Sequence, residues 1–273
     1  GYYGPLHELR IGTTERDRDF DDCANYPCGP GFYGDRHDLT TERCSGFCTA
    51  GHYCEQNANA VPVPCGAGTF YPGSGANNHS LCTSCFIGQF QNETGKETCL
   101  PCPAGSYSDA EGSTACSLCP TGGYCPRPAQ GSAALAFVPC GEGTWSDAFG
   151  LDVSTDCQAC SEGKFQPTKG AISSSACLTC AAGTVQPKAG QGACEQCAAG
   201  TYQDEPGSET CKPCMPGSFC TEGAAAPLPC PGGTTKNVSK KIMKSVADCV
   251  VCSEGTFCPV GSAQETPCAA GTF

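Results

Sequence analysis

The motif Cys-x-x-Gly occurs fourteen times in the 273 residues of this chain, and its spacing constrains the fold more than any other feature. An aromatic residue stands five positions after the cysteine in all but two copies, where Val185 and Thr235 take its place. A period this regular indicates a tandem array of small modules rather than one domain around a single core. The motifs open at Cys28, Cys48, Cys65, Cys85, Cys102, Cys119, Cys140, Cys160, Cys180, Cys197, Cys214, Cys230, Cys252 and Cys268.

The composition indicates what holds such modules together. The chain has 28 cysteines, a density typical of disulfide scaffolds, together with 36 glycines and 22 prolines. A module of about 17 residues buries too little apolar surface to fold alone and needs covalent cross-links. Because disulfides at this density persist only in an oxidising compartment, we expect an extracellular or cell-surface (secreted) protein.

Short modules carry one pair of cysteines and long modules carry two. The predicted boundaries are a partial module at 1–23, short modules at 28–44, 85–99, 102–116, 160–177, 180–194 and 197–211, long modules at 48–82, 119–157 and 214–249, and a truncated long module at 252–273. In each short module we expect the opening cysteine to bond the closing one. The pairs are Cys28–Cys44, Cys85–Cys99, Cys102–Cys116, Cys160–Cys177, Cys180–Cys194 and Cys197–Cys211.

Spacing does not fix the connectivity of the long modules. A crossed arrangement, first cysteine to third and second to fourth, would mimic growth-factor-like modules, and we favour it. The adjacent alternative would pair Cys119 with Cys125 and Cys140 with Cys157.

The local sequence predicts turns and short strands. Each Cys-x-x-Gly should form a turn, because glycine permits a positive φ or a close backbone approach. The residues that follow, as in Gly-Ser-Tyr107, favour a short strand whose aromatic packs on a disulfide. One short helix is predicted, from Ser239 to Asp248, with Ile242, Met243 and Val246 on one face. The expected fold class is small disulfide-rich modules in tandem, with short β-strands, turns and coil forming an elongated rod and almost no helix.

Three Asn-x-Ser/Thr sequons predict N-linked glycans at Asn78, Asn92 and Asn237. The longest apolar run, Ala133 to Val138, is far shorter than the roughly 20 residues that cross a bilayer, so we expect no direct membrane insertion. The formal net charge of −12 argues against nucleic acid and anionic membrane surfaces as partners.

Both ends of the chain fall inside a module. Gly1 and Tyr3 fit the glycine and aromatic positions of a further module, which would supply a partner for Cys23. At the other end, the module from Cys252 lacks its fourth cysteine. We therefore expect a stretch of a longer polypeptide; the alternative is that these terminal cysteines bond neighbouring copies.

The segments Cys102-Pro-Ala-Gly-Ser-Tyr-Ser-Asp-Ala-Glu-Gly-Ser-Thr-Ala-Cys116 and Cys197-Ala-Ala-Gly-Thr-Tyr-Gln-Asp-Glu-Pro-Gly-Ser-Glu-Thr-Cys211 resemble the ephrin-receptor-like cysteine-rich repeat, itself similar to tumour-necrosis-factor-receptor modules. The resemblance covers nearly the whole chain. Such repeats occur in receptor ectodomains, in secreted glycoproteins, and in protist and algal surface proteins, including flagellar-hair (mastigoneme) proteins. The resemblance implies an elongated rod without an inherent catalytic site, and it is weak evidence for one function, since the repeats serve many roles.

The sequence gives little evidence for a metal site, a redox-active dithiol or a catalytic site. Cys99-x2-Cys102 followed by Cys116-x2-Cys119 matches zinc-ribbon spacing, but a disulfide ladder produces the same spacing wherever one module closes and the next opens. The Cys-x-x-Cys pairs also resemble redox-active dithiols, but no βαβ pattern accompanies them. We expect no enzyme, no cofactor and no metal site. The histidines stand singly, at His7, His37, His52 and His79.

Three segments could do more than hold the fold. An acidic loop could bind calcium, although it lacks EF-hand spacing and is more simply a solvated loop. A basic cluster is either a solvated face or a contact with an acidic neighbour or polysaccharide. The apolar insert Ala133 to Val138 either covers its own module or is buried against another copy. The acidic loop has Asp17, Asp19, Asp21 and Asp22, and the basic cluster has Lys236, Lys240, Lys241 and Lys244.

These features favour a structural extracellular glycoprotein, a disulfide-laddered rod that assembles into a surface filament, fibre or coat. Its expected partners are copies of itself or other filament and surface proteins, together with N-linked glycans. The alternative function is the stalk or ligand-binding region of a cell-surface receptor, which a distinctive patch such as the lysine cluster would favour.

Overall fold

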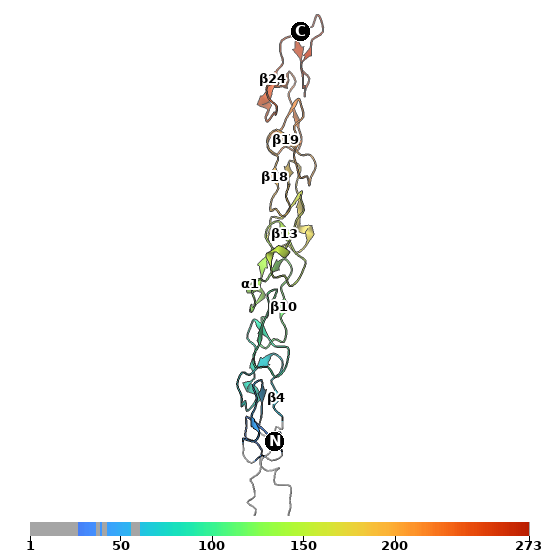
Figure 1. The fold of residues 1–273 in the computed structure, drawn as a ribbon. Helices are drawn as coiled ribbons and strands as arrows, with labels where there is room; N and C mark the ends of the chain where they lie inside the picture. The colour runs from blue at the N-terminus through green and yellow to red at the C-terminus, as the bar shows by residue number, and fades with distance from the viewer. Residues whose placement is uncertain (1–26, 37–38, 40–42, 56–60, 273) are drawn as a thin grey trace, which may run out of the picture. The chain divides into compact units, whose positions relative to one another are not determined.

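The protein folds into a series of two-residue or three-residue strands joined by turns (Figure 1). The computed structural model describes residues 27–36, 39, 43–55 and 61–272. Within them, each strand pairs with its neighbour in sequence to give thirteen two-stranded sheets. The fold class of short strand pairs in tandem disulfide-rich modules is confirmed. The elongated rod stays a prediction, as do the module boundaries.

The strand bounds follow the cysteine period. The first strands of the pairs are β1 (Phe32–Tyr33), β3 (His52–Tyr53), β5 (Thr69–Phe70), β7 (Gln89–Phe90), β9 (Ser106–Tyr107), β11 (Gly123–Tyr124), β13 (Thr144–Trp145), β15 (Lys164–Phe165), β17 (Thr184–Val185), β19 (Thr201–Tyr202), β21 (Ser218–Phe219), β23 (Thr234–Lys236) and β25 (Thr256–Phe257). The second strands are β2 (Gly46–Phe47), β4 (Val63–Pro64), β6 (Thr83–Ser84), β8 (Leu100–Pro101), β10 (Ser117–Leu118), β12 (Val138–Pro139), β14 (Gln158–Ala159), β16 (Leu178–Thr179), β18 (Glu195–Gln196), β20 (Lys212–Pro213), β22 (Leu228–Pro229), β24 (Cys249–Val251) and β26 (Thr266–Pro267).

Helix is scarce in the described part of the chain. It consists of α1 (Ala133–Ala136) and the 3-10 turns η2 (His79–Leu81), η3 (Ser154–Asp156), η4 (Ser174–Ala176) and η5 (Val246–Asp248). The helix predicted from Ser239 to Asp248 is wrong, since only η5 forms there. Met243 instead turns inward, with 3% of its surface exposed, and its carbonyl accepts a hydrogen bond from the Cys220 N–H.

One hairpin illustrates how the motif folds. Gly105 has φ of +82°, a conformation that favours glycine, and it places Ser106 and Tyr107 in β9. Tyr107 lies opposite Ser117 of β10, and the Cys119 N–H donates to the Gly105 carbonyl at 2.8 Å. We call the segment from one opening cysteine to the next a hairpin unit.

Thirteen disulfides join cysteines of the described residues, and Cys268 is the remaining described cysteine without a disulfide. Cys23, Gly1 and Tyr3 lie outside the described residues. The short modules contain Cys28–Cys44, Cys85–Cys99, Cys102–Cys116, Cys160–Cys177, Cys180–Cys194 and Cys197–Cys211, as the spacing predicts.

The crossed arrangement predicted for the long modules is wrong. Each long module has adjacent pairs, because it contains two hairpin units and each unit keeps its own disulfide. Cys119 bonds Cys125 within the first unit, with Cα atoms 5.9 Å apart, and Cys140 bonds Cys157 within the second at 5.8 Å. Both distances suit an unstrained bridge. The other adjacent pairs are Cys48–Cys54, Cys65–Cys82, Cys214–Cys220, Cys230–Cys249 and Cys252–Cys258.

The sixth residue after the opening cysteine contributes to loop closure in two kinds of hairpin unit. Where it is cysteine, as at Cys125, it bonds the opening cysteine directly. In four short units it is a buried glutamine, and Gln203 shows its role most fully. The Gln203 Nε2 donates to the Thr210 carbonyl at 2.7 Å, and its Oε1 accepts the Glu205 N–H at 3.0 Å. A side-chain amide thus ties the loop that the Cys197–Cys211 disulfide also closes. These glutamines are Gln91, Gln166, Gln186 and Gln203.

Consecutive hairpin units are joined by backbone hydrogen bonds. The Gly88 N–H donates to the Ser108 carbonyl of the next unit at 2.8 Å, and the Gly112 N–H of that unit donates to the Cys85 carbonyl at 2.8 Å. The same pair of contacts recurs further along, where Gly183 bonds Gln203 and Gly207 bonds Cys180. Each unit is therefore positioned by the backbone of its neighbour.

The buried apolar surface belongs chiefly to cysteines. Around α1, buried Cys119, Cys125 and Ala136 form one cluster, against which Tyr107 and Phe137 pack. Tyr107 therefore packs on the disulfide of the following unit, as predicted for the aromatic position. The apolar insert partly covers its own unit through Ala136, whereas Leu135 is 78% exposed.

The chain divides into two compact parts. The first has Gly1–Pro120, Tyr124–Val138 and Phe149–Asp152, and the second has Thr121–Gly123, Pro139–Ala148 and Val153–Phe273. The contacts between hairpin units described above each lie within one part.

Candidate functional surfaces

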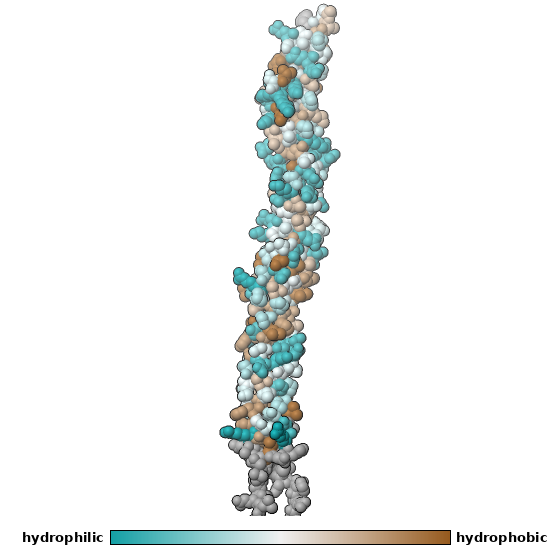
Figure 2. Space-filling model, viewed as in Figure 1, coloured by the Kyte–Doolittle hydropathy of each residue, from teal (hydrophilic) through white to brown (hydrophobic). Residues whose placement is uncertain are grey.

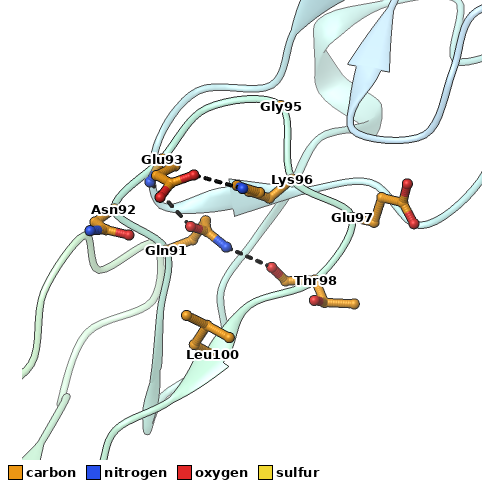
Figure 3. Close-up of a pocket in the computed structure, with 8 residues that line it drawn as sticks. All are labelled: Gln91, Asn92, Glu93, Gly95, Lys96, Glu97, Thr98 and Leu100. Atoms are coloured by element: carbon orange, nitrogen blue, oxygen red, sulfur yellow. Dashed lines mark hydrogen bonds and ion pairs between the residues drawn. The ribbon is translucent and has the colours of Figure 1, made fainter.

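The Asn92 sequon borders a shallow hollow in the first compact part (Figure 3). Buried Gln91 crosses this loop, donating from Nε2 to the Thr98 carbonyl at 2.9 Å and accepting the Glu93 N–H at 3.1 Å. Lys96 pairs with Glu93 at 2.6 Å across the same loop. Asn92 itself is exposed, so its amide is accessible on a loop that its neighbours hold in place.

Asn92 also borders a second, more apolar hollow, which includes Phe90, Pro103 and Leu118. This hollow is wide open to solvent, and it contains none of the charged side chains that mark the first hollow. In the first hollow, the titratable side chains are Glu93 and Lys96, which pair with each other, and Glu97.

The other two sequons are more tightly held. Asn78 caps η2, with its Oδ1 accepting the Ser80 N–H at 2.9 Å and its Nδ2 donating to Asn77 Oδ1 at 3.1 Å. The Asn237 Oδ1 accepts the Ser239 N–H at 3.0 Å. Both asparagines are half-buried. Glycosylation of all three stays a prediction, and Asn92 has the most accessible side chain.

In the lysine cluster, Lys236 ends β23, and Lys240, Lys241 and Lys244 lie on the loop that joins β23 to β24. Asp248 organises this loop: its carboxylate pairs with Lys240 Nζ and accepts the backbone N–H groups of Lys244 at 2.7 Å and Ser245 at 3.2 Å. The side chain of Asp248 is only 10% exposed. Sequence reasoning identified the lysines and missed this carboxylate, although it is the one acidic residue close to them in the sequence.

The electrostatics of Asp248 follow from these contacts. The Lys240 ammonium, together with the N–H groups of Lys244 and Ser245, lowers the pKa of the Asp248 carboxyl to about 2, against partial desolvation that would raise it. Asp248 is therefore ionised at neutral pH. The charge of Lys240 is neutralised by its ion pair with Asp248. The net positive charge of the cluster therefore comes from Lys236, Lys241 and Lys244.

Exposed apolar side chains accompany the lysines on this hairpin. Val238 is 91% exposed and Val251 is 81% exposed, while Ile242 and Val246 are about half exposed. Figure 2 shows hydrophobic and hydrophilic residues side by side at the level of β24. Exposed apolar and cationic groups side by side suit contact with another macromolecule better than simple solvation.

The cysteines whose spacing matches a zinc ribbon or a redox-active dithiol all form disulfides. Cys99, Cys102 and Cys116 form disulfides within their own modules, and Cys119 bonds Cys125, so none is a free thiolate ligand. Across the described ranges, no group of three or more His, Cys, Asp or Glu side chains could hold a metal ion. His7, His37 and the Asp17 to Asp22 loop lie outside the described residues.

The two described histidines have local partners. His52 Nδ1 lies 2.9 Å from the Ala50 carbonyl, and His79 Nδ1 lies 3.3 Å from Glu55 Oε1. Neither is joined by a nucleophile and an orienting carboxylate. Among the residues that the structure describes, no helix is long and apolar enough to cross a membrane.

Comparison with known proteins identifies a family that parts of this chain match. The family described as tyrosine-protein kinase ephrin type A/B receptor-like matches residues 76–115, 88–133, 172–214 and 183–227. The curated proteins contain no match to this chain. The overlapping matches fall on the Cys-x-x-Gly hairpin units, including those stapled by Cys102–Cys116 and Cys197–Cys211. Residues 76–133 and 172–227 are therefore tandem ephrin-receptor-like cysteine-rich repeats, a disulfide-rich module of the extracellular type.

Proposed function

We propose that this chain is a structural glycoprotein outside the cell, whose hairpin units build part of a surface filament, fibre or coat. The observation that carries the proposal is the repetition of one contact set. The hydrogen bond from Gly88 to Ser108 has a counterpart from Gly183 to Gln203, with the same donor and acceptor positions. A unit that positions its successor through backbone atoms extends a chain without requiring particular side chains.

The chemistry of the units supports a mechanical role over catalysis. The buried residues are mainly disulfide-bonded cysteines and the glutamines that close loops, such as Gln186 at 2% exposure. Disulfides stabilise small modules by about 2–4 kcal/mol each, which compensates for a minimal core. N-linked glycans at the three sequons would add a polar coat, and the partners are copies of the chain or other surface proteins.

A second candidate function is the stalk or ligand-binding region of a cell-surface receptor. The lysine-bearing loop at β23 and β24 favours it, because this unit departs from the regular pattern in length, charge and its Thr235. A receptor would use such a loop for a foreign ligand, whereas a filament protein would use it for a copy.

Electron microscopy of the native material tests the proposal. We expect regular filaments or a lattice, and we expect them to be lost after reduction with thiol, while alkylation without reduction leaves them unchanged. Isolated, unassembled molecules in native material would contradict the structural role and favour the receptor.

A further inference from the structure

One hairpin unit in the second compact part is positively charged, although the chain as a whole is negatively charged. Residues 230–251, the hairpin unit opened by Cys230, contain four lysines and one acidic residue, Asp248, a charge of +3. Since the whole chain carries −12, the remaining residues carry −15. Four of the nine lysines in the chain therefore lie within nine residues, from Lys236 to Lys244.

The loop that carries this charge is fixed from inside. Asp248 binds Lys240 Nζ and the N–H groups of Lys244 and Ser245, and buried Met243 anchors the loop to the Cys220 N–H. A loop held in this way fixes the backbone positions of Lys241 and Lys244, so less backbone entropy is lost on binding. We call Lys236, Lys241, Lys244, Val238 and Val251 the basic–valine surface.

The basic–valine surface is unpartnered within the described chain. None of its three lysines makes an ion pair with a described residue, in contrast to Lys96, Lys212 and Lys240. Its two valines are the most exposed large apolar side chains of the described residues, at 91% and 81%. A partner that carries both carboxylates and apolar side chains would pair with the lysines and cover the valines.

The second compact part has a surface with that chemistry. The hairpin unit opened by Cys140 and the turn after it carry Glu142, Asp147, Asp156 and Glu162, all exposed. Ion pairs among the described residues include none of these carboxylates. Val153, in the same hairpin unit, is also exposed. Pure polysaccharide anions would satisfy the lysines but offer little apolar surface for Val238 and Val251.

We propose that the basic–valine surface binds the acidic surface of the Cys140 unit on a second copy of this chain. The inference rests on the proposed function and names the contact by which copies assemble. We infer a heterologous contact, in which each copy uses its basic–valine surface on one neighbour and its acidic surface on another. A heterologous contact that does not close into a ring generates an open filament.

The test compares self-association of the native-length chain with that of charge variants, by sedimentation velocity across a concentration series. One variant carries Lys236→Gln, Lys241→Gln and Lys244→Gln, and a second carries Val238→Ser. A matched control removes three exposed lysines elsewhere that likewise have no ion pair with a described residue, through Lys164→Gln, Lys169→Gln and Lys188→Gln. Lys236 is half-buried and the other substituted side chains are exposed, and intact disulfides are verified by mass before comparison.

We expect the first variant to weaken association by about tenfold or more and the control by less than about threefold. Raising the ionic strength should weaken the wild-type chain towards the variant, because exposed charges are screened within about 10 Å at 0.1 M salt. The Val238→Ser variant should weaken association at both salt concentrations.

Carbodiimide cross-linking locates the contact. In an equal mixture of ¹⁵N-labelled and unlabelled chains, we expect mixed-isotope cross-links from Lys241 or Lys244 to carboxylates of the Cys140 unit. If wild-type chains associate and the three-lysine variant associates equally well, this surface is wrong while the filament proposal stands. If wild-type chains do not associate at all, both are wrong. Loss of polygalacturonate binding in the variant, with self-association unchanged, would assign the surface to a polysaccharide instead.

Discussion

The carbonyl oxygen of Gly112 lies against the α-carbon of Gly68, two hairpin units away, where a Cβ would come within 2.1 Å of it. Gly68 also has φ of +81°. The same relationship joins Gly163 to Gly207 in the second compact part. The glycine of Cys-x-x-Gly is thus required twice, by its turn and by the approach of a more distant unit.

Gly68→Ala should therefore destabilise the array locally. The positive φ alone costs about 1 kcal/mol for a residue with a Cβ, and the clash with the Gly112 carbonyl adds to it. We expect faster amide exchange at Gly112 and in β5. Gly66→Ala is the control, because a Cβ there meets nothing within 4 Å and its φ is not positive. Equal exchange in the two variants would contradict the contact.

Gln203→Ala should loosen its loop although it removes no disulfide. The substitution removes both hydrogen bonds of the buried Gln203 side chain, to the Thr210 carbonyl and from the Glu205 N–H, at a cost of about 0.5–1.5 kcal/mol for each bond. Thermal unfolding and exchange of residues 203–211 would measure it. Gln158→Ala, at an exposed position in β14, should change stability by less than about 0.5 kcal/mol. Comparable losses in both variants would show that the amide does not close the loop.

The sequence predicted the hairpin units because their determinants are local. The Cys-x-x-Gly turn places Gly105 at a positive φ whatever the neighbouring units are, and Tyr107 favours the short strand that follows. The Cys119–Cys125 bond was the alternative to the crossed pairing that we favoured, because cysteine spacing alone does not reveal which Cα atoms the turns bring together. A usable signal was present: Cys125 and Gln203 occupy the same sixth position after an opening cysteine.

In the lysine loop, a contact with a residue outside the cluster determines the backbone structure, and the local sequence pattern does not. The spacing of Ile242, Met243 and Val246 favoured a helix, but Asp248 binds the N–H groups of Lys244 and Ser245 and limits helical structure to η5. The acceptor lies beyond the cluster in sequence and carries no periodic signal. The charge of this surface was therefore predictable, and its fixed geometry was not.

Acid should release the lysine loop. The Asp248 pKa of about 2 lies below its ordinary value of 3.8, so ionisation favours the folded loop. This contribution is complete above about pH 4 and is lost as the pH falls through the folded-state pKa near 2. NMR or amide exchange of residues 240–248 between pH 6 and pH 1.5 should show it.

Asp248→Asn should produce a loosened loop at neutral pH, because the ion pair with Lys240 is absent. Asp156→Asn, an exposed carboxylate without an ion pair among the described residues, is the control for the folding of the loop. A loop that is unchanged in Asp248→Asn, or that titrates near pH 4 in the wild type, would contradict the role given to this carboxylate.

Asn92 should carry an N-linked glycan in protein secreted from a eukaryotic cell. Its side chain is exposed, on a loop tied by Gln91. Thr94→Ala should lower the intact mass by one glycan and leave the disulfides unchanged, whereas Glu97→Ala, outside the sequon, should not. An unchanged glycan mass in Thr94→Ala would remove Asn92 from the predicted sites.

The central claim is that every hairpin unit keeps its own disulfide, and chymotryptic mapping of the unreduced protein tests it most directly. Cleavage after Phe137 separates the two units of the long module. We predict one fragment containing Cys119 bonded to Cys125 and another containing Cys140 bonded to Cys157. A single disulfide-linked species that joins the two sides of Phe137 and separates only on reduction would show the crossed pairing and contradict this account.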